Sequence, residues 1–286
     1  MSSENVNLLS EKETLFTWPI RRVRATEAER LDDYVVVEEP LSLVVNGQQL
    51  AVLMRMPGQE KELAVGFCIS EGYLRRVEDI LLIHHCGLGH PAPDAEEEGG
   101  LGSRNRIEMR VVPEGFSAPE TPEVVRLIRS GCGAAQVSAV GETLPALSGV
   151  LTVRADVLLD LGKAMRDLQS VHRQVGGTHS AALFDAAGRA LVLAEDIGRH
   201  NAVDKATGHC LLRGVALHDK MLVTSGRASY EMVIKAVRLG VPIVATISAP
   251  TSLAVQLAQD RGLTLVGYLR GGRMNIYTHG ERILAE

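Results

Sequence analysis

Aromatic residues are scarce in this 286-residue sequence, which contains only four Phe, five Tyr and one Trp. The core must therefore be filled by Leu, Val, Ala and Ile, which suits buried parallel strands and the helices that cover them. Stacking platforms for single-stranded nucleic acid would be hard to build from so few rings. Basic residues are not in excess, because 30 Lys and Arg stand against 35 Asp and Glu, giving a formal net charge of −5. We therefore expect no general attraction to nucleic acid or to anionic membranes.

Long apolar runs and dense cysteines are also missing. The longest runs, such as residues 241–249, are far shorter than the 18 or more residues that a membrane span needs. The first twenty residues are charged and lack the apolar core of a secretory signal. The cysteines are too few and too scattered for a disulfide scaffold, since the chain has only Cys68, Cys86, Cys132 and Cys210. These absences predict a cytoplasmic protein whose thiols stay reduced.

The length predicts about two domains, which we place at residues 16–150 and 151–286, after a polar, disordered tail at residues 1–15. The first domain should be the smaller one and of α+β type, ending in a loop that contains Cys132. The pattern becomes β from Trp18, and the predicted strands cover residues 34–37, 41–45, 49–54, 80–84 and 106–112, with Asn46-Gly47 as a hairpin turn. Its predicted helices cover residues 62–74 and 121–130, and the second begins near Pro122 and stops at Gly131-Cys132-Gly133.

The second predicted domain alternates strands with helices. The strands are expected at residues 180–185, 191–195, 220–224, 243–247, 264–269 and 274–278. The helices are expected at residues 155–168, 201–212, 229–239 and 252–260. This order predicts an α/β fold with a mostly parallel sheet and right-handed crossovers.

Four loops follow predicted strands of this sheet: EDIGRHNAVDK, TSGRASYE, SAPTSLA and RGGRMN. The carboxyl ends of parallel strands meet at one sheet edge, and helix N-termini there favour an anion. Forked donors that match phosphate oxygens would come from Arg199, Arg227, Arg270 and Arg273. We therefore predict a phosphorylated ligand that contains a nucleotide. In the alternative interpretation, the glycines only make turns and the arginines pair with Glu195, Asp196 and Glu231.

Motifs for phosphotransfer and hydride transfer are absent, because the chain has neither G-x-x-x-x-G-K-[ST] nor a strand-linked G-x-G-x-x-G. The segment SGCGAAQ presents Cys132 between two glycines, which suits a nucleophile that must reach two partners. A small residue in a glycine turn would explain the same segment. Cys68 and Cys210 lie on apolar helical stretches typical of core thiols.

Histidines offer two further hypotheses. The only metal-like cluster is His84, His85, Cys86 and His90, and because its spacing matches no zinc pattern we expect no bound metal. Acid-base chemistry could use His172, His179, His200 or His209. The best placed is His200, beside Arg199 at a predicted helix start and in the same loop as Asp196.

Six segments together resemble the formate dehydrogenase accessory sulfurtransferase (sulfur carrier) family. They are EDIGRHNAVDK, TSGRASYEMVIKA, ISAPTSLAVQLA and VGYLRGGRMNIYT, with a weaker likeness in VVEEPLSLVVNG and LAVGFCISEGYL. The resemblance implies a protein that takes persulfide sulfur from a cysteine desulfurase. It passes the sulfur to the bis-molybdopterin guanine dinucleotide molybdenum cofactor, which formate dehydrogenase needs. It also implies a cytidine-deaminase-like, three-layer C-terminal domain. The sequence does not determine the oligomeric state, and a homodimer is one of the options.

The resemblance assigns roles to residues of this chain. The persulfide-bearing cysteine falls on Cys132, and the cofactor contact segment falls on Tyr268, Leu269, Arg270, Gly271, Gly272 and Arg273. From the other loops we add Ser225, Gly226, Arg227, Asp196, Arg199 and His200 as cofactor-binding candidates. The family usually shows C-G-x-C-G, whereas this chain has Ala135 in place of the second cysteine. One persulfide can still hand over its outer sulfur, but an intramolecular disulfide across this motif is excluded.

The deaminase-like fold raises the question of zinc-dependent deamination, which needs H-x-E and P-C-x-x-C. His179 is followed by Ser180 and Ala181 without the Glu, and no P-C-x-x-C occurs, so deamination is rejected. A nucleotide hydrolase lacks any recognisable metal or base constellation. Two hypotheses stand: a sulfur carrier, with Cys132 as nucleophile and Arg227, Arg270 and Arg273 on the phosphates, or a non-catalytic cofactor-binding chaperone.

Overall fold

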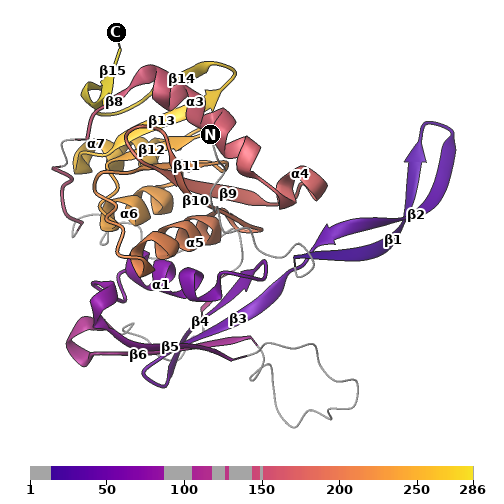
Figure 1. Cartoon of the computed structure of the whole chain (residues 1–286), viewed down its shortest axis with the longest axis horizontal. Helices are drawn as coiled ribbons and strands as arrows, with labels where there is room; N and C mark the ends of the chain where they lie inside the picture. Colours follow the sequence, from indigo (N-terminus) through magenta and orange to yellow (C-terminus); the bar gives the residue numbers. More distant parts are fainter. Residues whose placement is uncertain (1–13, 87–104, 118–125, 129–143, 149–150, 286) are drawn as a thin grey trace.

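The computed structural model describes residues 14–86, 105–117, 126–128, 144–148 and 151–285. A smaller sheet in the N-terminal part and a larger one in the C-terminal part enclose a layer of helices, and a long two-stranded arm projects from this body (Figure 1). In the part of the chain that is described, no helix is long and apolar enough to cross a membrane.

The smaller sheet has the strand order β5-β6-β3-β4-β7. Its central hairpin turns at Asn46 and Gly47, whose φ angles of 50° and 82° suit a two-residue turn and confirm the predicted hairpin. Helix α1 covers one face of the sheet and ends before Gly72, which has a φ of 84°. The elements are β3 (Glu39–Val45), β4 (Gln48–Arg55), α1 (Glu60–Ser70), β5 (Ile80–Cys86), β6 (Arg106–Val111) and β7 (Arg126–Ile128), with 3-10 turns at Val77–Asp79 and Pro113–Gly115.

The predicted helix over residues 121–130 is wrong where the structure describes it. Residues Arg126–Ile128 form β7, which pairs in parallel with β4 so that Ile128 lies opposite Leu53. A short apolar run fits a helix or a buried strand equally well by periodicity alone. The unpaired edge of β4 decides between them, because it offers the backbone hydrogen bonds that a strand needs.

The larger sheet has the order β10-β9-β11-β12-β13-β14, and it is mixed where we predicted a mostly parallel one. Only β11, β12 and β13 pair in parallel; β9 and β14 run against their neighbours. Short connections explain the difference, since β9–β10 and β13–β14 are hairpins and only longer helical crossovers allow parallel pairing. The strands are β9 (His179–Phe184), β10 (Ala190–Asp196), β11 (Met221–Thr224), β12 (Ile243–Thr246), β13 (Thr264–Arg270) and β14 (Arg273–Ile276).

Helices cover both faces of the larger sheet and give the three layers that were expected. One face packs on α3, and the other packs on α5, α6 and α7. Each of these four helices lies within two residues of its predicted range. Their bounds are α3 (Ala155–Leu168), α5 (Arg199–Leu212), α6 (Tyr230–Arg238) and α7 (Ser252–Arg261). Sequence reasoning missed α4 (Val171–Val175), the pair β8 (Val153–Arg154) with β15 (Ile283–Leu284), and the 3-10 turn at Gly280–Arg282.

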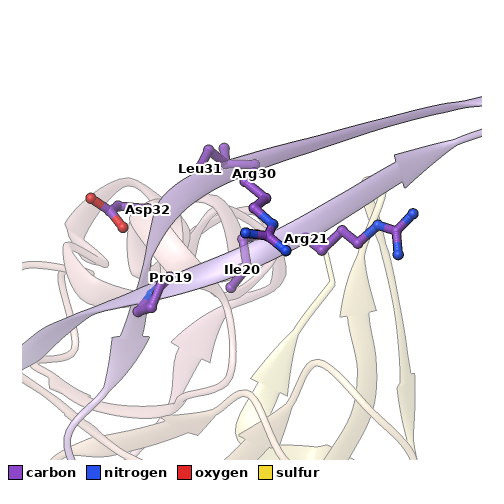
Figure 2. Close-up of a pocket in the computed structure, with 6 residues that line it drawn as sticks. All are labelled: Pro19, Ile20, Arg21, Arg30, Leu31 and Asp32. Atoms are coloured by element: carbon purple, nitrogen blue, oxygen red, sulfur yellow. The ribbon is translucent and has the colours of Figure 1, made fainter.

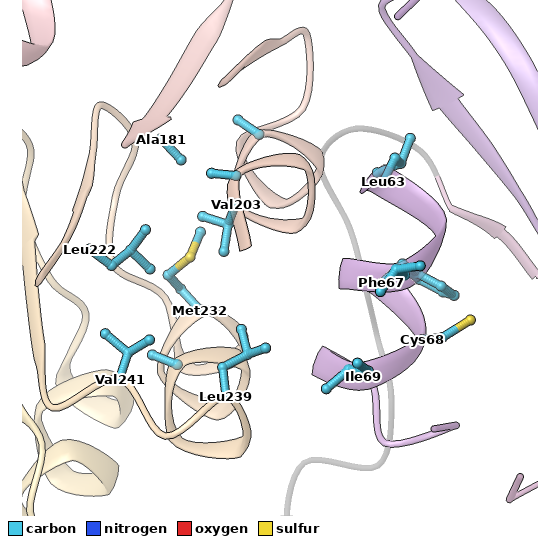
Figure 3. Close-up of a cluster of buried hydrophobic side chains, with 14 of the residues drawn as sticks. Leu63, Phe67, Cys68, Ile69, Ala181, Val203, Leu222, Met232, Leu239 and Val241 are labelled. Atoms are coloured by element: carbon cyan, nitrogen blue, oxygen red, sulfur yellow. The ribbon is translucent and has the colours of Figure 1, made fainter. Parts of the chain in front are cut away.

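The two halves of the chain share one continuous hydrophobic cluster, which joins α1 to α5, α6 and the larger sheet (Figure 3). Glycine makes the contact between α1 and α5 close. A Cβ added to Gly66 would lie 1.9 Å from the Asp204 carbonyl oxygen, and one added to Gly208 would lie 1.9 Å from that of Glu62. The described elements before and after the predicted boundary at 150 therefore pack against each other through α1, α5 and α6.

Candidate functional site

Four loops meet at one edge of the larger sheet. Strands β10, β11, β12 and β13 all point the same way, so their carboxyl ends share this edge. Backbone hydrogen bonds join the loops: Ala228 N donates to the Ala249 oxygen (3.2 Å), and Tyr268 N donates to the Ser248 oxygen (2.9 Å). The predicted convergence of these loops is confirmed.

Asp196 lies at this edge but faces inward. Its carboxylate is fully buried and pairs with Lys205 Nζ at 2.7 Å. It also accepts hydrogen bonds from the backbone N–H groups of Met56 and Gly198 and from Asn201 Nδ2. Because these partners occupy its oxygens, Asp196 anchors the loop to the N-terminal half and has no oxygen free to point at a ligand.

Glu195 also serves the fold. Its carboxylate accepts the backbone N–H groups of Ser170, Val171 and His172 at 2.8–2.9 Å, so it occupies the N-terminus of α4. The alternative interpretation, in which the site arginines pair with Glu195, Asp196 and Glu231, is therefore wrong. Among the described residues, no salt bridge within 4.0 Å involves Arg199, Arg227, Arg270 or Arg273.

The N-termini of α5 and α6 lie together and are incompletely satisfied. Gly226 lets the two approach, since a Cβ there would lie 3.0 Å from Cβ and Cδ of Arg199. Three buried polar atoms at these two termini have no hydrogen-bond partner among the described residues: Arg199 Nε, His200 Nε2 and Ser229 Oγ. Buried polar atoms without a partner are rare in folded proteins. Three of them at one sheet edge indicate a place where a ligand supplies the missing partners.

Two histidines at this edge are neutral at physiological pH. Burial, with Lys235 and Arg199 nearby, lowers the pKa of His200 to about 3. Burial and the charge of Arg199 also lower the pKa of His179, whose Nδ1 lies 3.4 Å from Ser225 Oγ. Glu231 Oε2 lies 3.5 Å from His200 Nε2, but the two atoms do not form a hydrogen bond, and a neutral imidazole forms no ion pair with this carboxylate. The positive charge available to an anion therefore comes from the arginines.

The segment RGGR forms the turn of the β13–β14 hairpin. Gly271 and Gly272 have φ angles of 62° and 69°, which place Arg270 and Arg273 opposite each other on the surface. The Arg270 guanidinium lies over the Tyr268 ring, 5.6 Å from its centre. Leu269 instead is fully buried in the core that α3 covers. Of the six residues assigned to the cofactor contact segment, five are at least partly accessible and Leu269 faces inward.

Cys132 lies outside the described residues, but the strand before it is described. In β7, Ile128 lies opposite Leu53 of β4. The end of β4 touches the site loop, because the Met54 oxygen accepts from Asn201 Nδ2 at 2.8 Å. The four residues from Ile128 to Cys132 can span at most roughly 14 Å. The chain therefore leaves the smaller sheet at the end where β4 contacts Asn201 of the candidate site, a link that the sequence pattern did not reveal.

Beneath the site lies a buried charged network that sequence reasoning missed. Lys235 Nζ contacts Asp204 Oδ2 (2.9 Å), Glu71 Oε1 (2.7 Å) and Ser70 Oγ (2.7 Å). Burial, with only partial relief from Lys235, raises the pKa of Asp204 to about 6. A sequence signal did exist, since Lys235 lies among the apolar residues of α6. The network fixes α1 to α5 and α6 below the partnerless atoms.

The other cysteines and histidines have structural positions. Cys68 and Cys210 are buried as predicted, and burial raises the pKa of both thiols, to about 11 for Cys210. Cys86 is half-buried at the end of β5. The described residues contain no group of three or more His, Cys, Asp or Glu placed to hold a metal ion, and His90 lies outside them.

Known proteins share the sequence pattern of this chain over most of its length. The profile of the FdhD/NarQ family matches residues 36–284. This chain belongs to the FdhD/NarQ family. It is 40% identical to a protein of Nocardia farcinica named sulfur carrier protein FdhD, over 92% of this chain and 93% of that one. A protein of the same name from Saccharolobus solfataricus is 38% identical, over 92% and 95%.

A solved structure extends the likeness to the fold. A crystal structure from Desulfotalea psychrophila, described as that of a formate dehydrogenase accessory protein, superposes with a TM-score of 0.73 at 26% identity. The match covers 95% of this chain and 100% of that one. The family assigned from the sequence segments is confirmed.

Proposed function

We propose that this member of the FdhD/NarQ family is a sulfur carrier that serves formate dehydrogenase. Its relatives bear the name sulfur carrier protein, and the family match spans nearly the whole chain. The observation that supports the proposal is the sheet edge, where the arginines form no ion pair and three buried polar atoms have no hydrogen-bond partner among the described residues. The ligand that we propose is the bis-molybdopterin guanine dinucleotide molybdenum cofactor, bound as a substrate.

The residues at the edge fit the phosphates of such a dinucleotide. Arg270 and Arg273 offer forked donors from one hairpin, and Arg227 and Arg199 offer them from the neighbouring loops. Ser229 Oγ and His200 Nε2 can each form a hydrogen bond that no described residue makes with them. Asp196 is buried and anchors the loop, and the Leu269 side chain faces the core. We therefore do not include these two side chains among the proposed contacts to the cofactor.

The proposed chemistry takes place at Cys132. A cysteine desulfurase would supply the outer sulfur of a persulfide on this thiol. In the transfer step, an electron pair of the acceptor forms a bond to the outer sulfur while the sulfur–sulfur bond breaks, and Cys132 leaves as the thiolate. No second thiol is needed, which agrees with Ala135 at the position where the family usually has a cysteine. The position of β7 supports the proposal. Its last residue, Ile128, precedes Cys132 by four positions and pairs with the end of β4 that contacts the site.

The mass of the intact protein, measured after incubation with a cysteine desulfurase and cysteine, tests this function. We expect a gain of one sulfur atom that a reductant removes, and we expect Cys132→Ala to abolish it. Cys86→Ala and Cys210→Ala are the controls and should keep the gain, since Cys210 is buried and its thiol pKa is raised. A gain that survives Cys132→Ala would contradict the carrier function.

A non-catalytic chaperone is the second candidate, favoured by the single observation that Ala135 replaces the usual cysteine. In that case the sheet edge would bind and deliver the cofactor while Cys132 plays no part. The two candidates differ in whether a Cys132 variant can still activate formate dehydrogenase.

A further inference from the structure

His179 lies at the sheet edge where the anionic ligand is proposed to bind, but none of the proposed contacts includes it. It is the first residue of β9 and pairs with Asp196, the last residue of β10. Because β9 runs antiparallel to both β10 and β11, its first residue lies where those two strands end. Its side chain is half-buried, so it remains in contact with solvent.

The charged groups that act on the His179 ring come from four neighbouring elements. Arg199 begins α5, Arg227 lies in the loop after β11, and His172 lies in α4. The carboxylate that acts on the ring is Asp196, whose charge is already balanced by a buried lysine. Burial, Arg199, His172 and Arg227 together lower the pKa of His179 below its ordinary 6.5. In the protein without a ligand, the ring is therefore neutral at physiological pH.

The hydroxyl group of Ser225 can support a second proton on the ring. Ser225 Oγ accepts a hydrogen bond from the backbone N–H of Ser180 at 2.9 Å and lies 3.4 Å from His179 Nδ1. A hydroxyl oxygen has two lone pairs, so it can accept from Ser180 and from a protonated Nδ1 at the same time. The ring can therefore carry a positive charge without leaving Nδ1 unpaired.

An anion bound at this edge would reverse the charge around the ring. Arg199 and Arg227 are proposed contacts of the phosphates, and they are also the two arginines that act on His179. A phosphate held by both arginines places negative charge beside the ring, and an opposite charge within about 4–6 Å favours the protonated form of a histidine. The ligand thus offsets the arginine charges that keep the free ring neutral.

His200 lies at the same edge but is unsuited to this role. Its side chain is only 13% exposed, and burial, with Lys235 and Arg199 nearby, lowers its pKa to about 3. A ligand would have to raise that pKa almost to neutrality before His200 gained a proton. His179 is half-buried and open to solvent, so a smaller change in its surroundings is enough.

A second concave place with arginines lies on the projecting arm, which consists of β1 (Leu15–Arg24) and β2 (Glu27–Val36). A shallow concavity crosses this ribbon (Figure 2). It is lined by Pro19, Ile20, Arg21, Arg30, Leu31 and Asp32. Its charged side chains are exposed, and none of the six residues has a buried polar atom without a partner. It therefore lacks the buried groups that distinguish the sheet edge, and it provides a control.

We propose that the sheet edge binds its anionic ligand together with one proton from solvent, and that His179 is the residue that takes up this proton. The inference rests on the proposed function, because it concerns the same anionic ligand. As an imidazolium, the ring adds one positive charge to those of Arg199 and Arg227. Affinity should therefore be highest at low pH, and it should fall as the pH rises from the pKa of the free ring to that of the ligand-bound ring.

Calorimetric titration of the full chain with diguanosine 5′,5′-pyrophosphate tests this inference, because the charge of that doubly esterified pyrophosphate is constant near neutral pH. Titrations in two buffers of different ionisation enthalpy count the protons taken up with the ligand. Wild type should take up a proton in the range where its dissociation constant rises with pH, by up to about tenfold per pH unit. His179→Gln should lose most of this uptake and most of the pH dependence. Arg30→Ala is the control on the arm and should keep both.

Nuclear magnetic resonance of the wild-type chain, labelled with carbon-13 in the histidine rings, gives a second measurement on the ring itself. The His179 signal is the one that is missing in His179→Gln or His179→Asn. Its titration midpoint should lie below 6.5 in the free protein and should rise when the pyrophosphate is added. The midpoint of the exposed His218 should not change.

Binding without proton uptake, or with an unchanged His179 midpoint, would overturn this inference alone and leave the binding role of the edge intact. Uptake that survives His179→Gln but disappears in His172→Gln or Glu231→Gln would assign the proton to another residue and also overturn it. Failure of wild type to bind the pyrophosphate would overturn the proposed ligand site together with this inference. The mass measurement on Cys132 would still test sulfur transfer independently.

Discussion

Two kinds of helix N-terminus lie at the same edge of the larger sheet, and they differ in what completes them. At α4, the Glu195 carboxylate accepts three successive backbone N–H groups. At α5 and α6, Arg199 Nε, His200 Nε2 and Ser229 Oγ are buried with no hydrogen-bond partner among the described residues. The first is an anion site that the chain fills itself, which stabilises the loop. The second is a similar arrangement that no described residue completes, and this difference supports the proposal that a ligand binds there.

The same contrast separates the charged groups. Asp196 and Lys205 satisfy each other inside the protein, whereas Arg270 and Arg273 remain on the surface with no ion pair among the described residues. Residues of the first kind should control folding, and residues of the second kind should control ligand affinity. Substitutions can therefore test whether the two roles are separable.

The largest effect should come from Cys132→Ser, which leaves both kinds of residue in place. Oxygen replaces sulfur with little change in volume, so binding of the cofactor should remain near wild type. The hydroxyl cannot carry a persulfide sulfur, so activation of formate dehydrogenase should be abolished. The measurement is formate-dependent dye reduction in cells that lack the native gene and are complemented with each variant at equal protein level.

Cys86→Ser is the control for this experiment and should retain activity, because Cys86 lies at the end of β5 in the smaller sheet. Full activity from Cys132→Ser would support the chaperone candidate and leave only the binding role of the sheet edge.

The next largest effect should come from Lys205→Met, which breaks the buried ion pair between Lys205 and Asp196. Lys205 and Asp196 are both fully buried, and the substitution leaves the Asp196 carboxylate without its charged partner. Breaking a buried pair in this way costs about 3–5 kcal/mol of the free energy of unfolding. Chemical denaturation measures it, with Lys163→Met as control, since the Lys163–Asp167 pair is exposed. A loss no greater than that of the control would show that the anchor is not needed.

Arg270→Ala and Arg273→Ala should instead weaken ligand binding without lowering stability. Each should cost about 1.5–3 kcal/mol of binding free energy for a guanine nucleotide, the usual value for a charge-assisted hydrogen bond. Calorimetric titration with guanosine diphosphate measures the loss. Arg189→Ala is the matched control, because Arg189 is equally exposed but lies in the β9–β10 turn at the opposite edge of the sheet. Unchanged affinity in the double variant would place the site elsewhere.

Sequence reasoning predicted the loops well because strand ends and helix starts have local signals. The segments around Arg199, Ser225 and Arg270 each follow a run of buried apolar residues, and a parallel arrangement brings them together. It could not show that Asp196 and Leu269 face inward, since that depends on Lys205, Met56 and the packing of α3. Such contacts join residues more than a hundred positions apart, as between Met56 and Asp196, and no local pattern records them.

The helix predicted at the position of β7 was wrong for the opposite reason. Its local pattern fits a helix, and only the free edge of β4 selects a strand. The arm shows the same limit: the β pattern from Trp18 onward was visible, but not that its two strands leave the body as a ribbon. Pairing between distant segments and the absence of a covering element are both properties of the whole fold.

The smallest effect should come from His200, whose side chain is largely buried in the first turn of α5. Burial lowers its pKa to about 3 from the ordinary 6.5, so the folded protein resists protonation there. As the pH falls below 6.5, the unfolded chain takes up a proton at this position that the folded chain does not, and stability decreases until the pH reaches the folded pKa. His200→Gln should remove this contribution and flatten the dependence of the unfolding free energy on pH by at most about 1.4 kcal/mol per pH unit. Denaturation at pH 7, 6 and 5 measures the slope, with the exposed His218→Gln as control. Equal slopes for wild type and His200→Gln would mean that His200 takes up its proton over the same pH range in the folded and the unfolded chain, which would contradict the lowering of its pKa by burial.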